Sequence, residues 1–179
     1  MKNTILQYLK TAHKTGEHTL TSGRKSNFYV DVKSLMFNAK FIDLLGHAMC
    51  SAISFKWADT IVAVGGMEMG SIPISTAVVI KSNKMHEIPY NHFVVRKNPR
   101  THGTGCQIEG IEYIRNKSVI IVDDVLTSGM SILKTASILE QNGVECKGAI
   151  VVVDRQERIY TFPFPVINLF TRNDIITND

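Results

Sequence analysis

Residues 119–131 read Val-Ile-Ile-Val-Asp-Asp-Val-Leu-Thr-Ser-Gly-Met-Ser, and this stretch decides the fold. Its first four residues are β-branched and apolar, as expected of a strand that is buried on both faces of a parallel sheet. Asp123 and Asp124 follow directly, so we expect them at the carboxyl end of that strand, where open α/β sheets bind their ligands. A helix that begins in the next turn and runs to about Gln141, with Asn142 and Gly143 as its stop signal, completes a strand–loop–helix unit.

The turn between this strand and this helix has the composition of a phosphate site. Residues 127–131 offer hydroxyl and N–H donors, and Gly129 lets the backbone approach a ligand closely. The first N–H groups and the dipole of the helix also favour an anion. The alternative is that these polar residues are only turn formers and N-caps. The complete string favours a site for a sugar that carries a phosphate and a metal ion.

Other segments of the chain predict the rest of a sheet and its helices. Short apolar runs predict strands, and an apolar stripe at helical spacing predicts a helix. The alternation of the two predicts an α/β fold with a doubly wound, mainly parallel sheet flanked by helices, and a small hood formed mainly by residues 1–35. The expected strands are 61–64, 92–95, 119–122 and 149–153, with 166–170 as a candidate edge strand, and the further helices are 41–55 and 72–83.

Composition excludes several classes of protein. A length of 179 residues with 44% hydrophobic and 20% charged residues suits one globular domain, residues 1–179. The net charge of +4 is mild, and the basic residues are not interleaved with aromatics as on a nucleic-acid surface. The three cysteines lack metal-site spacing, and residues 1–10 have no long apolar core. We therefore expect a reduced, cytoplasmic protein with neither nucleic acid nor membrane as partner.

A basic loop at residues 96–105 reads Arg-Lys-Asn-Pro-Arg-Thr-His-Gly-Thr-Gly. Three fixed cations and a histidine in a loop with one proline and two glycines suit a lid that closes over pyrophosphate and excludes water. The alternative is a solvent-exposed basic turn that binds no ligand. The cluster of charge at 96–100 is better explained by a polyphosphate ligand.

Three more segments contain residues that could bind a ligand. In 64–74 we expect a loop after the strand, in which Gly65, Gly66 and Gly70 expose backbone N–H groups to pyrophosphate, although a tight strand-to-helix turn fits equally well. Residues 19–31 predict a hairpin with a strand over 27–31. The strand at 151–153 runs into charge at Arg155, which on the sequence alone suits a strand-end ion pair.

Together these segments resemble the type I phosphoribosyltransferases, and among them the orotate phosphoribosyltransferases. The 119–131 string resembles the motif that binds phosphoribosyl pyrophosphate (PRPP), and no Walker Gly-Lys-Ser/Thr is present. The basic loop resembles an Arg-Lys-x-x-Lys-x-His-Gly pattern, with Arg100 in place of a lysine. Residues 22–29 resemble the hood pattern Ser-Gly-x-x-Ser-x-x-Tyr. Thr21 and Met69 stand where relatives often have lysine.

The resemblance implies an enzyme of pyrimidine synthesis that transfers the 5-phosphoribosyl group of PRPP to orotate, giving orotidine 5′-monophosphate and pyrophosphate. It also implies Mg²⁺ carried by PRPP, with no direct protein ligand unless Asp123 and Asp124 reach it, and a homodimer whose basic loop enters the partner's site. A phosphoribosyltransferase for another base, or a PRPP-sensing regulator that binds nucleic acid without catalysis, stays open as an alternative.

Residue roles follow from the same resemblance. The acidic pair would orient the ribose, and the basic loop would stabilise pyrophosphate, with His102 as proton donor or cationic clamp. The expected catalytic residues are Lys97, Arg100, His102, Asp123 and Asp124. The expected PRPP contacts are Arg96, Lys97, Arg100, His102, Glu68, Met69, Gly70, Asp123, Asp124, Val125, Leu126, Thr127, Ser128, Gly129, Met130 and Ser131. The expected orotate contacts are Thr127, Arg155, Lys25 and Tyr29, with Arg155 at the carboxylate of the base.

Overall fold

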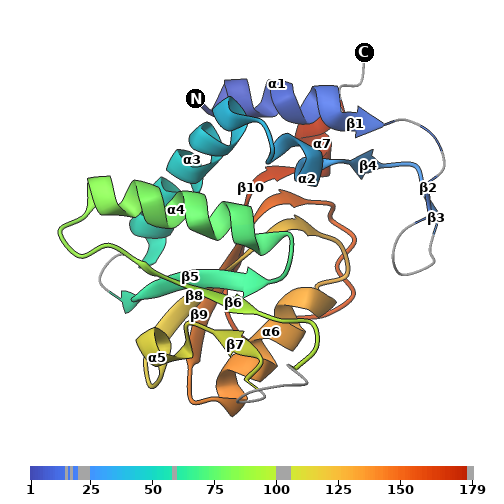
Figure 1. The fold of residues 1–179 in the computed structure, drawn as a ribbon. Helices are drawn as coiled ribbons and strands as arrows, with labels where there is room; N and C mark the ends of the chain where they lie inside the picture. Colours follow the sequence, from blue (N-terminus) through green and yellow to red (C-terminus); the bar gives the residue numbers. More distant parts are fainter. Residues whose placement is uncertain (15, 17, 20–24, 58–59, 100–105, 177–179) are drawn as a thin grey trace.

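A six-stranded sheet forms the centre of the protein (Figure 1), in a computed structural model that describes all residues except 15, 17, 20–24, 58–59, 100–105 and 177–179. Five of its strands are parallel, and the short β7 joins one edge antiparallel to β6. The prediction of a mainly parallel sheet is therefore confirmed. Across the sheet the order is β10 (Val166–Thr171), β9 (Glu145–Asp154), β8 (Ser118–Leu126), β5 (Ala63–Met67), β6 (Asn91–Val95) and β7 (Ile108–Glu109).

Helices cover both faces of this sheet (Figure 1). One face carries α3 (Ala39–Trp57) and α4 (Ser71–Met85), and the other carries α6 (Met130–Gln141) and the short α5 (Ile111–Ile114). The apolar run of β8 serves both layers, because Ile120 and Val122 join one core cluster and Val119 and Ile121 join the other. This double burial is the reason that the run contains no polar residue.

The observed elements extend beyond the apolar runs that predicted them. The strand expected at 119–122 continues to Leu126, so Asp123 and Asp124 lie inside β8 rather than after it. The ladder to β9 continues through Leu126↔Asp154, which keeps the backbone extended past the last apolar residue of the run. The helices expected at 41–55 and 72–83 gain a few residues at their ends, and the candidate edge strand is β10.

The expectation for Gly65 and Gly66 was wrong. Both residues are buried within β5 instead of forming the ligand loop, and they pair with Phe93 and Val94 of β6. A Cβ on Gly65 would overlap the carbonyl oxygen of Phe93, and one on Gly66 would overlap that of Val122. These glycines therefore allow close approach of backbone within the sheet.

The N-terminal hood consists of short elements that share the main core. Its parts are α1 (Lys2–Ala12), β1 (His13–Lys14), β2 (His18–Thr19), β3 (Lys25–Ser26), β4 (Tyr29–Val30) and α2 (Val32–Leu35). The single strand expected over 27–31 is replaced by β3 and β4, which belong to two separate hairpin-like pairs, β2–β3 and β1–β4. Phe28, between them, is fully buried, and its insertion into the core interrupts the strand.

The C-terminal part of the chain returns to the hood. Residues 155–165 form neither helix nor strand and lead into β10, which ends in α7 (Arg172–Ile175). α7 packs beside α1 (Figure 1). Among the described residues, no helix has the length and apolar character that crossing a bilayer requires.

Candidate functional site

The sheet opens between β8 and β5, and a cavity lies there. The last register pair between these strands is Gly65↔Ile121, while β8 continues to Leu126 beside β9 alone. The chain turns from β5 toward β6 on one side and from β8 toward β9 on the other, which makes this the switch point where α/β sheets bind ligands. The cavity has a volume of about 740 Å³ and is lined by hood residues 29–33, by Met67, Glu68, Gly70 and Lys97, by residues 123–125 and 127–131, and by Arg155, Glu157 and Ile159.

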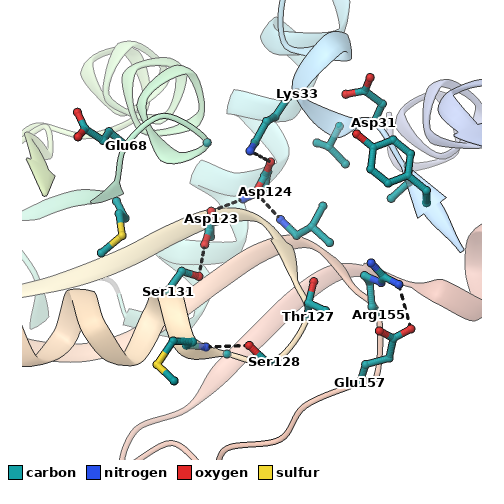
Figure 2. Close-up of a pocket in the computed structure, with 18 of the residues that line it drawn as sticks. Asp31, Lys33, Glu68, Asp123, Asp124, Thr127, Ser128, Ser131, Arg155 and Glu157 are labelled. Atoms are coloured by element: carbon teal, nitrogen blue, oxygen red, sulfur yellow. Dashed lines mark hydrogen bonds and ion pairs between the residues drawn. The ribbon is translucent and has the colours of Figure 1, made fainter. Parts of the chain in front are cut away.

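The acidic pair lies in the middle of this cavity (Figure 2). Asp123 Oδ1 accepts the N–H of Asp124 at 2.9 Å, and its Oδ2 accepts the hydroxyl of Ser131 at 2.8 Å. Asp124 Oδ1 accepts the N–H of Val125 at 2.8 Å, and its Oδ2 lies 3.9 Å from Nζ of Lys33. These contacts fix both carboxylates before any ligand binds.

Burial of the Asp123 carboxyl, together with the negative charge of Asp124, raises the pKa of Asp123 to about 7. The hydrogen bond from Ser131 opposes this shift only in part. A raised pKa means that the folded chain destabilises the charged form of Asp123. Ligands that bring hydroxyl donors or a cation would stabilise the charged form of such a pair.

The turn that follows the pair forms the start of α6. Gly129 has φ +96°, a left-handed conformation, and a Cβ there would lie 2.5 Å from the ring of Phe162. The N–H of Met130 donates to Ser128 Oγ at 3.4 Å, and all of residues 127–131 line the cavity. The first turn of a twelve-residue helix thus faces the cavity, as an anion site requires. Leu126 is buried in the core and does not line the cavity.

The loop between β5 and α4 brings Gly70 and Glu68 to the cavity. A Cβ on Gly70 would lie 3.0 Å from Asp124 Oδ1 and 3.3 Å from Asp123 Oδ1, so a larger residue would crowd the acidic pair. Glu68 Oε1 accepts the N–H of Lys97 at 2.9 Å, which ties this loop to the basic loop. Met69 is 70% exposed and does not line the cavity.

The basic loop is described only at its two ends. Lys97 lines the cavity, whereas Arg96 Nε points to Glu109 of β7 at 2.5 Å, and this hydrogen bond raises the pKa of Arg96. Arg96 therefore does not line the cavity, and its described role is to hold the base of the loop. Arg100 and His102 lie outside the described residues, as does the side chain of Lys25.

The far wall of the cavity carries the predicted base-binding residues. Arg155 follows β9 directly, is only 4% exposed, and donates from Nη2 to Glu157 Oε1 at 3.1 Å. Figure 2 shows Thr127 between the acidic pair and Arg155. Tyr29 of the hood lines the same cavity. Arg155 thus forms the strand-end ion pair and also faces the cavity, so the two interpretations of this residue are compatible.

Seven residues that line the cavity were not among the predicted site residues, namely Val30, Asp31, Val32, Lys33, Met67, Glu157 and Ile159. Three of them had a signal: Asp31 and Lys33 follow Tyr29 at alternate positions, and Glu157 follows Arg155 in the same way. Ile159 had none, because it is placed by the bond from its N–H to the carbonyl of Ser128 (3.2 Å) in a segment without regular structure. Among the described residues, no three His, Cys, Asp or Glu side chains gather as a metal site.

Replacing Asp123 should stabilise the fold in a pH-dependent way. Because its folded pKa is raised, the chain loses stability as the pH rises from about 4 through about 7, and Asp123→Asn removes that loss. We expect the Asn variant to melt roughly 2–4 °C higher than wild type at pH 8, the shift that about 1 kcal/mol gives at this chain length. The difference should shrink as the pH falls and should disappear below about pH 4, where the carboxyl is protonated in the folded and the unfolded chain.

Asp43→Asn is the matched control, measured in the same thermal melts. A hydrogen bond from Lys81 lowers the pKa of Asp43, so its ionised form contributes stability above its unfolded pKa. Asp43→Asn should therefore not melt higher than wild type at pH 8. A gain for Asp123→Asn that is equal at pH 5 and pH 8 would show that charge at this site does not limit stability.

Comparison with known proteins agrees with this geometry. Residues 35–179 match the phosphoribosyl transferase domain family. The chain is 37% identical to the orotate phosphoribosyltransferase of Methanosphaera stadtmanae, over 87% of this chain and 83% of that one. It is 40% identical to that of Pyrococcus abyssi, over 80% and 75%. The crystal structure of Mycobacterium tuberculosis orotate phosphoribosyltransferase in complex with PRPP superposes with a TM-score of 0.75 and 26% identity, over 97% and 98%. The chain therefore belongs to the phosphoribosyltransferases and, among them, to the orotate phosphoribosyltransferase family.

Proposed function

We propose that this protein transfers the 5-phosphoribosyl group of PRPP to orotate, releasing pyrophosphate and orotidine 5′-monophosphate for pyrimidine synthesis. The observation that carries the proposal is one cavity with three kinds of site. It combines an acidic pair, an anion-binding helix start and a buried arginine. A relative of this chain has been crystallised with PRPP, which supports the same ligand here.

The phosphate and the ribose would occupy the end formed by β8 and α6. The N–H groups and hydroxyls of residues 127–131 are placed to bind the 5′-phosphate. Asp123 and Asp124 are placed to accept hydrogen bonds from the ribose hydroxyls, because both carboxylates are already oriented by backbone N–H groups. Their negative charge would also stabilise the positive charge that develops on the ribose as pyrophosphate departs.

Pyrophosphate would occupy the side of the cavity between Gly70 and Lys97. Gly70 leaves its backbone open beside the acidic pair, and Lys97 brings a cation from the basic loop. The side chain of Met69 is exposed and uncharged, so the cations of the basic loop would supply more of the positive charge that binds pyrophosphate. Arg100 and His102 would also stabilise the departing pyrophosphate, because closing such a loop over the site excludes water and strengthens each charge contact.

The residues at this site suit Mg²⁺ bound together with PRPP. Carboxylate oxygens are ligands that Mg²⁺ accepts, and its positive charge would offset the burial and the repulsion from Asp124 that raise the pKa of Asp123. When bound, Mg²⁺ would supply positive charge that neutralises the leaving pyrophosphate. Asp123 and Asp124 are the residues that would contact it.

The proposal also covers the oligomeric state and the cellular location of the enzyme. We propose a homodimer in which the loop at 96–105 enters the partner's site, on the strength of the family resemblance. We also propose a cytoplasmic location. Cys50, Cys106 and Cys146 are all free thiols, which fits a reducing compartment.

An orotate-depletion assay tests the function itself. The purified protein should consume orotate only when PRPP and Mg²⁺ are both present, and it should release pyrophosphate in equal amount. A substrate panel with uracil and purine bases provides the comparison. Turnover of a purine or of uracil without turnover of orotate would assign the enzyme to another base, and PRPP binding without any turnover would favour a regulator.

Removing the charge of Lys97 should slow turnover and leave the fold intact. Lys97 is exposed at the mouth of the cavity, and its loss removes a cation aimed at the leaving pyrophosphate. We expect Lys97→Met to lower kcat by about 100-fold, the usual effect of removing one transition-state donor, with an unchanged melting temperature. Lys117→Met, an exposed lysine that does not line the cavity, is the control. A kcat for Lys97→Met within twofold of the control would remove Lys97 from the mechanism.

A further inference from the structure

The wall that carries Arg155 contains a second arginine that does not line the substrate cavity. Glu157 lies between them, with Oε1 at 3.1 Å from Arg155 Nη2 and 3.5 Å from Arg172 Nη1. Arg172 belongs to α7 and lines a separate cavity of about 470 Å³ behind this wall. Arg172 therefore acts on the substrate cavity only indirectly, and its ion pair with Glu157 is one contact through which it can do so.

Phe28 holds the two guanidinium groups in place from the hood side. The guanidinium carbon of Arg155 lies 5.6 Å from the centre of the Phe28 ring, and that of Arg172 lies 5.4 Å from it. The ring is fully buried, so it cannot move away without opening the core. Contacts of this kind attract a cation to an aromatic ring and become stronger when water is excluded. The three charged groups therefore form one fixed unit around Phe28.

The net charge of this unit determines whether it attracts or repels an anion. Arg155 and Glu157 alone would be neutral together, and the Glu157 carboxylate also lines the substrate cavity, where it would repel a negative ligand. Arg172 adds a positive charge and draws the same Glu157 oxygen, which leaves the unit with a net charge of +1. Glu157 can then orient the Arg155 guanidinium without cancelling its attraction for a carboxylate.

We propose that Arg172 is a positioning residue for the base, which neutralises Glu157 so that Arg155 binds the carboxylate of orotate. This inference rests on the proposed function, because it presupposes that orotate is the base. It assigns to α7 a part in substrate selection, although α7 lies outside the substrate cavity. The substrate property that it governs is the negative charge of the base.

Steady-state kinetics with Arg172→Met test the proposal. We expect the KM for orotate to rise about tenfold, the effect of losing about 1.4 kcal/mol of binding, with the KM for PRPP unchanged. Any turnover of uracil, which lacks the carboxylate, should not fall. Arg172→Lys, which keeps the charge, should restore most of the orotate KM. Arg172→Gln should behave like Arg172→Met, and it keeps the test available if the methionine variant does not fold.

The double variant Glu157→Gln with Arg172→Met separates neutralisation from a structural role. Glutamine still offers an oxygen to Arg155 but carries no charge that needs neutralising, so the orotate KM should return to within about threefold of wild type. A purely structural role of Arg172 predicts no such recovery. Arg115→Met, an exposed arginine that lines neither cavity, is the control.

Two kinds of result distinguish this inference from the proposed function. If wild type turns over orotate and Arg172→Met has an unchanged KM for orotate, or the double variant does not recover, the role of Arg172 is wrong and the function stands. If wild type binds PRPP but does not turn over orotate, the proposed function fails and this inference fails with it.

Discussion

The site depends on two adjacent carboxylates, those of Asp123 and Asp124, which are held where β8 and β5 separate in the central sheet. β8 parts from β5 after Ile121 and continues beside β9, so Asp123 and Asp124 face a cavity instead of a neighbouring strand. The pair is oriented by the backbone N–H groups of Asp124 and Val125 and by the hydroxyl of Ser131, and Gly70 leaves space beside it. Every other part of the site is arranged around these carboxylates: the start of α6, the loop before α4 and the hood.

This arrangement costs stability in the unliganded protein. Burial and the neighbouring charge raise the pKa of Asp123, which means that the folded chain would be more stable without one of the charges. Lys33, at 3.9 Å from Asp124, lies too far away and is too exposed to offset this repulsion fully. Ligands that bring hydroxyl donors and a cation relieve the same repulsion. In the proposed function, the stability that is lost at this pair would favour the binding of PRPP together with Mg²⁺.

The sequence allowed the layers of the fold to be predicted because burial leaves a clear pattern. The run from Val119 to Val122 is apolar at every position since both of its faces are covered, and Gly129 marks the turn into α6. Ends of elements were predicted less well, because pairing with β9 carries β8 through two charged residues that no pattern assigns to a strand. Gly65 and Gly66 were misplaced for a similar reason, since close approach of strands and of ligands both require glycine.

Contacts between distant segments could not be predicted in this way. Arg96 pairs with Glu109 across β6 and β7, and Arg172 reaches Glu157 only because β10 returns beside β9. Such pairs depend on the completed sheet, whereas local spacing finds only neighbours such as Arg155 and Glu157. The family resemblance predicted Arg155 as a contact of the base, and the structure adds the charged groups that surround it.

Calorimetric titration of the protein with PRPP and excess Mg²⁺ at pH 6.5, in two buffers of different ionisation enthalpy, tests the central claim most directly. If the ligand binds the ionised acidic pair, the wild type should release on the order of half to one proton more than Asp123→Asn on binding. This difference should vanish at pH 8, where Asp123, with its pKa of about 7, is mostly ionised before binding. Equal proton release by the two proteins at pH 6.5 would contradict the account, because the ligand would then not engage the carboxylate around which the site is built.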